Sequence, residues 1–194
     1  MNWRRIIVPV LLVLATSSLR AQNIAIKSNL LYDATGTINL GFEGRIADKW
    51  TAELTGNLNP WMMKDQAHWK HAYLQPEIRW WFCDTFSGHF LALHLHGGIF
   101  NVGNLNNDIW IPGCDLSPLR DSRFQGWFAG AGIGYGYDLI LSRHWNLEFE
   151  IGAGYAYSLS DQFECGVCGS TIAEDITHHY FGITKAAVSL VYLF

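Results

Sequence analysis

The feature that most constrains the fold is the alternation of side chains in residues 179–194. One face of this stretch carries Lys185, Ala187 and Ser189 before it turns apolar, and the other face is apolar or small almost throughout. A period of two residues indicates a β-strand, and this one exceeds the roughly five or six residues usual in soluble domains. A long strand that ends on an aromatic residue is typical of the closing strand of an outer-membrane barrel. Its outward face is expected to comprise Tyr180, Gly182, Thr184, Ala186, Val188, Leu190, Tyr192 and Phe194.

Seven earlier segments alternate in the same way, and with the last stretch they predict eight strands. Each divides into an apolar face and a face rich in Gly, Asn, Glu, Arg and His, which suits a tight polar lumen better than the solvated face of a soluble sandwich. Pro76 lies within the fourth segment, and because proline removes a ladder donor we expect a bulge there. The strands are expected at residues 23–32, 37–46, 50–59, 71–82, 90–102, 126–141, 145–159 and 179–194.

The connections between these segments alternate in length. Residues 47–49, 83–89 and 142–144 form short connections, whereas the intervening ones at 33–36, 60–70, 103–125 and 160–178 are mostly longer. Outer-membrane barrels have an even number of strands, short periplasmic turns and long outer loops. We therefore expect an all-β fold, an eight-stranded antiparallel transmembrane up-and-down β-barrel with a filled polar lumen.

Aromatic residues gather near both ends of the expected strands. Two such girdles around an aliphatic band match the two interfaces of a bilayer. The periplasmic set is Trp50, Trp80, Phe82, Tyr137, Trp145, Tyr192 and Phe194, and the outer set is Tyr32, Trp61, Trp127, Tyr155, Tyr157 and Tyr180.

The first 21 residues have the pattern of a cleaved secretory signal. Arg4 and Arg5 precede an apolar run at residues 6–15, and Ala21 is a suitable small residue before the cut. The run is too short for a membrane helix, although a retained anchor helix is the alternative. Residues 22–194 then form one barrel domain with 10 Lys and Arg against 17 Asp and Glu, a net charge of −7. Without a basic stripe, this charge argues against nucleic acid as a partner.

The polar faces carry a set of charged and imidazole side chains. An eight-stranded barrel has room for side chains but hardly for solute, so these charges are expected to be paired. Paired carboxylates also serve as general acids and bases, and His94 and His96 have a spacing seen in metal sites. We favour an ionic plug, with the histidines hydrogen-bonded beside Glu77, and no cofactor. The set is Lys27, Glu43, Arg45, Glu53, Glu77, Arg79, His94, His96, Asp138, Glu148, Glu150 and Lys185.

Three of the four cysteines fall in expected outer loops. Cys165 and Cys168 form a CxxC pair followed by glycine, and Cys114 lies in the neighbouring long loop, whereas Cys83 begins a periplasmic turn. In an oxidising exterior we favour a disulfide among the outer three. The alternatives are free thiols, or a metal site in which two of Cys114, His178 and His179 complete the CxxC pair.

A set of motifs is spread over nearly the whole mature chain. The motifs are Trp50-Thr51-Ala52-Glu53-Leu54, Gly56-Asn57, Asn59-Pro60-Trp61, Trp69-Lys70-His71, Gln75-Pro76-Glu77, Arg79, Trp81-Phe82-Cys83, Gly126-Trp127-Phe128, Cys165-Gly166-Val167-Cys168-Gly169, Tyr180-Phe181-Gly182, Thr184-Lys185-Ala186-Ala187 and Ser189-Leu190. Together they resemble one family, the Bacteroidota outer-membrane barrels called domain of unknown function 3575. The resemblance implies the same barrel and compartment, and makes the CxxC loop a family feature. The family is often seen near fimbria-related genes and has no established activity, so it implies no catalytic residue.

We therefore expect a non-enzymatic structural or accessory barrel in the outer membrane. Its outer loops would meet a surface partner, in fimbria or cell-surface structure assembly. One alternative is a lipid-modifying or proteolytic enzyme, but the expected lipid face offers Ser28 and Thr184 without a histidine or acid in phase. The other alternative, a narrow pore, is disfavoured by the strand count and the bulky lumen residues.

The first prediction concerns the outer cysteines. If Cys165 pairs with Cys168 or Cys114, alkylation without reductant will leave two of these three thiols unlabelled, and intact-mass measurement will show their labelling only after reduction. Cys83 serves as the internal control, because it is expected to label under both conditions. Labelling of all four thiols without reductant would reject the disulfide.

Overall fold

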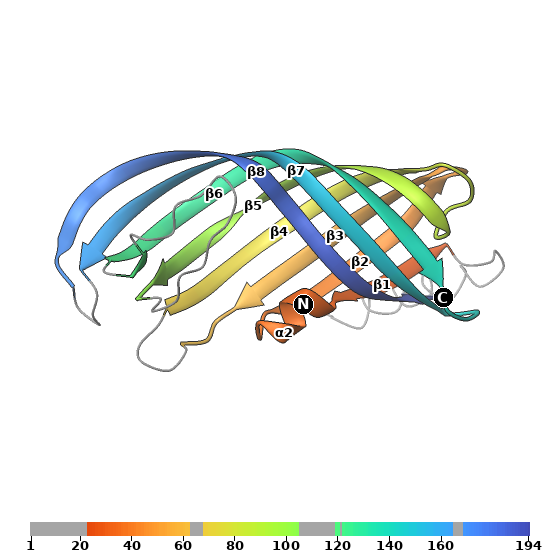
Figure 1. Ribbon diagram of the computed structural model, residues 1–194, viewed down its shortest axis with the longest axis horizontal. Coiled ribbons are helices and arrows are strands. Elements are labelled where there is room, and N and C mark those ends of the chain that lie inside the picture. Colours follow the sequence, from red (N-terminus) through yellow and green to blue (C-terminus); the bar gives the residue numbers. More distant parts are fainter. Residues whose placement is uncertain (1–22, 63–67, 105–118, 121, 165–168) are drawn as a thin grey trace, which may run out of the picture.

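The computed structural model describes residues 23–62, 68–104, 119–120, 122–164 and 169–194. Eight antiparallel strands follow one another around a closed barrel (Figure 1), which confirms the expected fold class. The predicted signal peptide and Cys114, Cys165 and Cys168 lie outside the described residues. The strands are β1 (Ile24–Asn29), β2 (Ile38–Ala47), β3 (Trp50–Asn59), β4 (His68–Trp81), β5 (Gly88–Gly103), β6 (Ser122–Ile140), β7 (Trp145–Glu164) and β8 (Thr171–Leu193), and a short helix α2 (Leu30–Ala34) follows β1.

The last strand closes the barrel against the first. Strand β8 pairs with β1 from Ala25 opposite Leu193 to Asn29 opposite Ser189. The amide of Phe194 then donates to the carbonyl oxygen of Ile24 at 3.1 Å. Neither β1 nor β8 is therefore left as an unpaired sheet edge, which would expose a row of backbone donors and acceptors.

The two ends of the barrel differ. At one end, here called the turn end, residues 48–49, 82–87 and 141–144 connect the strands. At the other, the loop end, α2 follows β1, and β3, β5 and β7 end at Asn59, Gly103 and Glu164. This is the expected sorting of short and long connections. Strands β6, β7 and β8 extend furthest at the loop end (Figure 1).

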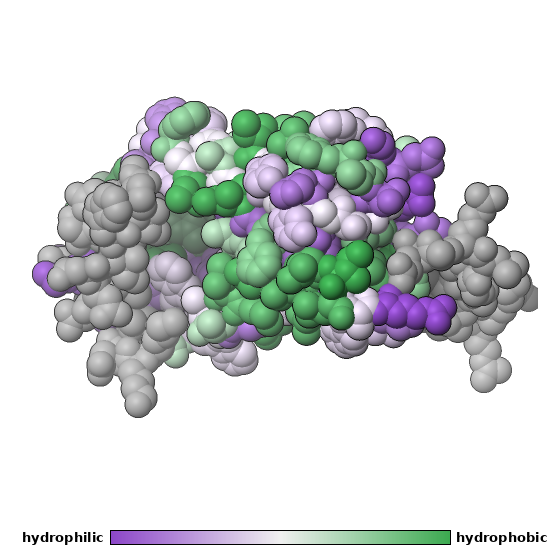
Figure 2. Space-filling view, turned by 45° about the vertical axis from the view of Figure 1, so that its right-hand side comes forward, coloured by the Kyte–Doolittle hydropathy of each residue, from purple (hydrophilic) through white to green (hydrophobic). Residues whose placement is uncertain are grey.

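The outward face is apolar over the middle of the barrel. Figure 2 shows hydrophobic residues covering much of the central part of one face. Along the strands, exposed aliphatic side chains such as Leu93, Ile133 and Ile151 alternate with buried polar ones. A polar interior inside an apolar outer band is the pattern of a transmembrane barrel. Among the described helices, none has the length and hydropathy needed to span a membrane.

Most of the aromatic girdle residues lie on the outside as expected. Exposed members at the turn end are Trp50, Trp80, Phe82, Tyr137, Trp145 and Phe194, and at the loop end Trp61, Trp127 and Tyr155. Tyr32 and Tyr180 are the two exceptions, since both point inward and their expected place in the girdle is wrong. Two local features explain this, the helix after β1 and a bulge in β8.

The first feature is helix α2, where we expected the first strand to continue to residue 32. The Asn29 side chain ends the strand, because its Oδ1 accepts a hydrogen bond from the Leu31 amide at 3.1 Å and caps the helix. Asp33 then accepts hydrogen bonds from Ser28 at 2.9 Å and from Asn39 at 2.8 Å. The helix turns Tyr32 toward the lumen, where its ring lies edge-on to Tyr73.

The second feature is a β-bulge in β8. Gly152 lies opposite Lys185 but Ala153 lies opposite Ile183, so Thr184 is an extra residue. A bulge of this kind shifts the alternation by one position. On the loop side of it, Phe181 and Ile183 face outward, and the expected outward positions of Tyr180, Gly182 and Thr184 are wrong.

The expected bulge at Pro76 is also wrong. Pro76 lies opposite Leu54 in an unshifted ladder with β3. On the β5 side, pairing is interrupted at residues 75–76 but resumes in the same register. The ladder thus tolerates the missing donor by a local gap in pairing rather than by an inserted residue.

The expected loop at residues 160–178 is largely strand. Strand β7 runs on to Glu164 and β8 begins at Thr171. The two strands remain paired in this part, with two further register shifts. Polar residues lie on both faces here, and apolar ones such as Phe163, Ile172 and Ile176 are scattered, so the sequence lacks the apolar alternation that marks the membrane-spanning part.

The turn end of the lumen is closed by an apolar cluster. Phe86, with φ of 62°, folds back from the turn after β4, and its carbonyl oxygen accepts a hydrogen bond from Asn146 at 2.9 Å. It packs against Trp81, whose Nε1 donates to Thr51 at 2.9 Å. The cluster comprises Ala25, Trp81, Phe86, Phe90, Ala92, Val191 and Leu193.

The second prediction concerns barrel closure. Deletion of Tyr192–Phe194 removes two of the five β1–β8 pairs together with the buried Leu193. We expect this deletion to abolish the heat-modifiable band that a folded barrel gives on gels.

The matched control is Phe194→Ala, which removes an exposed side chain and keeps the backbone bond to Ile24. It is expected to fold. Normal heat modifiability of the deletion variant would contradict the closing role of these residues.

Candidate functional site

The middle of the lumen is organised around one arginine. Arg79, on β4, is fully buried, and its guanidinium lies over the ring of Phe90, 4.5 Å from the centroid. A guanidinium has five N–H donors in a planar fork, which lets one side chain serve several carboxylates. Its partners are Glu43, Glu53, Glu77, Glu148 and Glu150, at nitrogen–oxygen distances of 2.5–3.0 Å.

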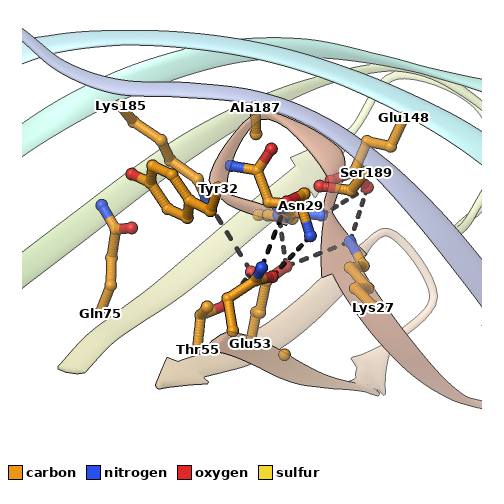
Figure 3. A pocket seen from close by; sticks show the side chains of 13 residues that line it. Lys27, Asn29, Tyr32, Glu53, Thr55, Gln75, Glu148, Lys185, Ala187 and Ser189 are labelled. Atoms are coloured by element: carbon orange, nitrogen blue, oxygen red, sulfur yellow. Dashed lines mark hydrogen bonds and ion pairs between the residues drawn. The ribbon is translucent and has the colours of Figure 1, made fainter. Parts of the chain in front are cut away.

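Two lysines complete the network from the closing strands. Lys27 of β1 bonds Glu43 and lies 2.6 Å from Glu148. Lys185 of β8 lies 2.6 Å from Glu77 and 2.9 Å from Glu150. Figure 3 shows Lys27 and Lys185 reaching toward carboxylates from opposite sides of the pocket.

Acidic groups outnumber basic ones in this network. Among the described residues, Asp138 and the five glutamates make six acids against Arg79, Lys27 and Lys185, all at most 7% exposed. Asp138 lies opposite Glu148, and Glu43 opposite Glu53, so like charges face each other across two strand pairs. With all six ionised and the histidines neutral, the network would have a formal charge of −3, so it is poised to take up positive charge.

The space left within the network is small. The pocket lined by Lys27, Glu53, Arg79, Glu148 and Lys185, among others, has a volume of about 20 Å³ (Figure 3). This is room for about one water molecule. The ionic network therefore plugs the middle of the barrel.

Two histidines lie on the loop side of the plug. His94 is fully buried, its Nε2 lies 2.9 Å from the Thr184 hydroxyl, and its Nδ1 lies 3.9 Å from Glu77. The neighbouring ring of His96 is 5.7 Å away between centroids. Glycines of β6 leave space for these groups, since a Cβ at Gly132 would lie 2.6 Å from His94 Nε2. The other β6 glycines in the lumen lie in the same way beside His96, Phe90 and Glu150.

An aromatic layer follows toward the loop end. Tyr73 and Phe128 lie 5.8 Å apart between ring centroids, and Phe128 also contacts His96. With Ala156, Tyr180 and Thr184 these residues line a cavity of about 250 Å³. The lumen is therefore apolar at the turn end, ionic in the middle and aromatic toward the loop end.

The structure places eleven of the twelve expected lumen residues inside the barrel. Arg45 is the exception, and its assignment to the lumen is wrong. It lies where the β2–β3 register shifts, at the turn end, and its exposed guanidinium bonds Asp48 of the same turn at 2.9 Å. A strand end beside a shifted register no longer keeps the inward alternation.

The candidate metal ligands outside the lumen are only partly described. His178 and His179 are exposed on β8, and His179 Nδ1 is hydrogen-bonded to the Tyr155 hydroxyl at 2.6 Å. Cys83 is a free, exposed cysteine. The metal-binding or disulfide role of the outer CxxC stays a prediction.

Within the described residues, one group of side chains could hold a metal ion. Ligand atoms of Glu77, His94 and Glu150 all lie within 4.8 Å of one another. The sequence suggested that His94 lies near Glu77, but it did not suggest that Glu150 joins them. Glu150 lies on β7, and β7 pairs with neither β4 nor β5, which carry the other two side chains.

The third prediction tests the role of Arg79 in the ionic network. Arg79→Met removes a cation bonded to five buried carboxylates, and breaking a buried ion pair typically costs about 3–5 kcal/mol. We expect a loss of at least about 3 kcal/mol in the free energy of unfolding, measured by urea titration in detergent micelles. Arg45→Met is the matched control and should leave the urea concentration at the unfolding midpoint unchanged, since its partner Asp48 is solvent-exposed. Equal urea midpoints for the two variants would show that Arg79 does not stabilise the network.

Comparison with known proteins gives a family. No curated protein matches the chain. Among solved structures, it is similar to the NMR solution structure of the outer membrane protein W from E. coli, with 12% sequence identity and a TM-score of 0.36 over 91% of this chain and 100% of that one. The family model described as "Protein of unknown function (DUF3575)" matches residues 7–194. The chain therefore belongs to the DUF3575 family.

Proposed function

We propose that this protein is a non-enzymatic barrel of the outer membrane, with a structural or accessory role, whose outer loops bind a partner at the cell surface. The observation that carries the proposal is the filled lumen, with about 20 Å³ of space inside the ionic network. A plugged barrel offers no path through its centre, so its interactions are confined to its ends and its outer face.

The outward face supports the membrane part of the proposal. Large side chains such as Ile133, at 70% exposure, would be costly in water but are favourable in lipid. Because barrels of this type carry short turns on the periplasmic side, we assign the turn end to the periplasm and the loop end to the exterior. Outer-membrane lipid is then the partner of the apolar band.

Two features argue against the enzyme alternative. Thr184 was expected on the lipid face without a histidine partner, and both expectations are wrong, because its hydroxyl points inward and lies 2.9 Å from His94 Nε2. That pair lies beside the plugged middle of the lumen and away from the lipid face on which a lipid-modifying enzyme would need it. Ser28 does have an acidic partner, since its hydroxyl donates to Asp33 at 2.9 Å, which corrects the expectation that no acid is in phase. A serine that donates directly to a carboxylate is not arranged like a nucleophile activated by a histidine base. The buried carboxylates are held by Arg79 and the lysines.

The fourth prediction concerns the pore alternative. Because the ionic network and the cluster around Phe86 close the lumen, the purified barrel should give no steady conductance in planar bilayers. A porin inserted in the same membrane serves as positive control. Stable open-channel steps that scale with protein insertion would show that the lumen conducts.

The partner would bind at the loop end. Trp61 and Met62 are exposed there, at 53% and 55%, and the Trp61 indole is fixed by a hydrogen bond to the Gly36 carbonyl oxygen at 2.9 Å. A rigid, exposed tryptophan is a common anchor of protein interfaces. The resemblance to a family seen near fimbria-related genes makes fimbrial and other cell-surface proteins the partners to examine first.

The fifth prediction tests this placement. A photo-crosslinking amino acid at Met62 should capture a specific protein in intact cells of the native host. The same amino acid at Asp48, which is fully exposed in a periplasmic turn, is the matched control and should not capture it. Capture from Asp48 alone would place the partner in the periplasm, and capture from neither site would refute a partner at this rim.

A further inference from the structure

We propose that Glu77, His94 and Glu150 bind one divalent transition-metal ion, such as Zn²⁺, inside the barrel. The three side chains come from β4, β5 and β7, and their ligand atoms already lie within 4.8 Å of one another. Imidazole and carboxylate together suit the first-row divalent ions. Three protein ligands are also the usual number in zinc sites that keep one position for water.

The state of His94 is the first argument. Its side chain is fully buried, and its Nδ1 has no hydrogen-bond partner. The other ring nitrogen lies 2.9 Å from the Thr184 hydroxyl, which resembles the outer partner that usually orients a metal-bound histidine. If Nε2 carries the proton for that bond, the lone pair of Nδ1 faces Glu77 Oε2 at 3.9 Å. Two acceptors face each other, and a cation between them would satisfy both.

The charge of the network is the second argument. Six buried acids surround three cations among the described lumen residues, and Oε1 of Glu150 has no hydrogen-bond partner. A buried, uncompensated charge costs several kcal/mol. A divalent ion would lower the formal excess from −3 to −1 at the place where unpartnered acceptors gather.

Lys185 would adjust to the ion. Its ammonium now bridges Glu77 Oε2, at 2.6 Å, and Glu150 Oε2, at 2.9 Å. Glu53 Oε1 lies only 3.9 Å from the same nitrogen. Because the lysine stem is flexible, a small shift toward Glu53 would release carboxylate oxygens to the metal while Lys185 stays paired.

An entry path leads to the site from the loop side. The cavity of about 250 Å³ is lined by Thr184 and His96, and both residues contact His94. From the turn end, the cluster around Phe86 and Phe90 blocks approach. The ion would therefore arrive from the exterior side of the barrel.

The test measures metal retained by the full-length mature barrel without an affinity tag. The protein is refolded in detergent with excess ZnCl₂ and passed through a gel-filtration column in metal-free buffer, and zinc is counted by mass spectrometry. All samples carry Cys114→Ser, Cys165→Ser and Cys168→Ser, so that the CxxC loop contributes no zinc. We expect one equivalent in this parent protein and a loss of that equivalent in His94→Asn and in Glu150→Gln.

His179→Asn is the matched control, because His179 is exposed on the outside of β8. It should retain the full equivalent. Heat-modifiable migration on gels verifies that each variant is folded, and Glu150→Gln provides the test if His94→Asn does not fold. Absence of zinc from the folded parent, as expected if protons alone neutralise the network, would overturn the proposal. Unchanged zinc in both folded lumen variants would also overturn it.

Discussion

The rest of the structure depends on the cost of enclosing carboxylates in a narrow barrel. Five glutamates converge on Arg79, which is fully buried. A buried charge is tolerated only when it is paired and its remaining donors are satisfied. The strands that supply Arg79, Lys27 and Lys185 must therefore keep their register, because a slip of one residue would turn these cations toward lipid. The pairing of these buried charges is thus coupled to the register of the strands that carry them.

Room for this network comes from small residues and from one irregularity. Gly132, Gly134 and Gly152 lie beside His94 or Glu150, where any Cβ would come within 2.6–2.8 Å of these side chains. The bulge at Thr184 then changes the phase of β8. It lets Lys185 enter the network and Thr184 contact His94 on the same side of the strand. A regular strand would send one of these two adjacent side chains into the membrane.

Side-chain periodicity was enough to predict the strand count, the antiparallel order and the burial of most lumen residues. Those properties depend only on alternation along each strand and on adjacent register. The corrections arise where a single residue changes the backbone. Asn29 starts a helix by capping it, and Thr184 adds a residue to β8. Phe86 enters the lumen from a turn with a positive φ. None of these changes alters the hydrophobic pattern from which the strands were predicted, and the convergence of Glu77, His94 and Glu150 requires the closed three-dimensional barrel.

The layering of the lumen restricts where function can reside. Apolar side chains around Phe86 close the turn end, and the ionic network fills the middle. Among the described residues, the cavity that reaches toward the buried histidines lies on the loop side. A solute or ion that enters from the loop end can approach His94, whereas one from the turn end meets the packed rings of Trp81 and Phe90. Because the ionic network fills the lumen and the outward face of the middle is apolar, the partner binding proposed above would be confined to the loop end.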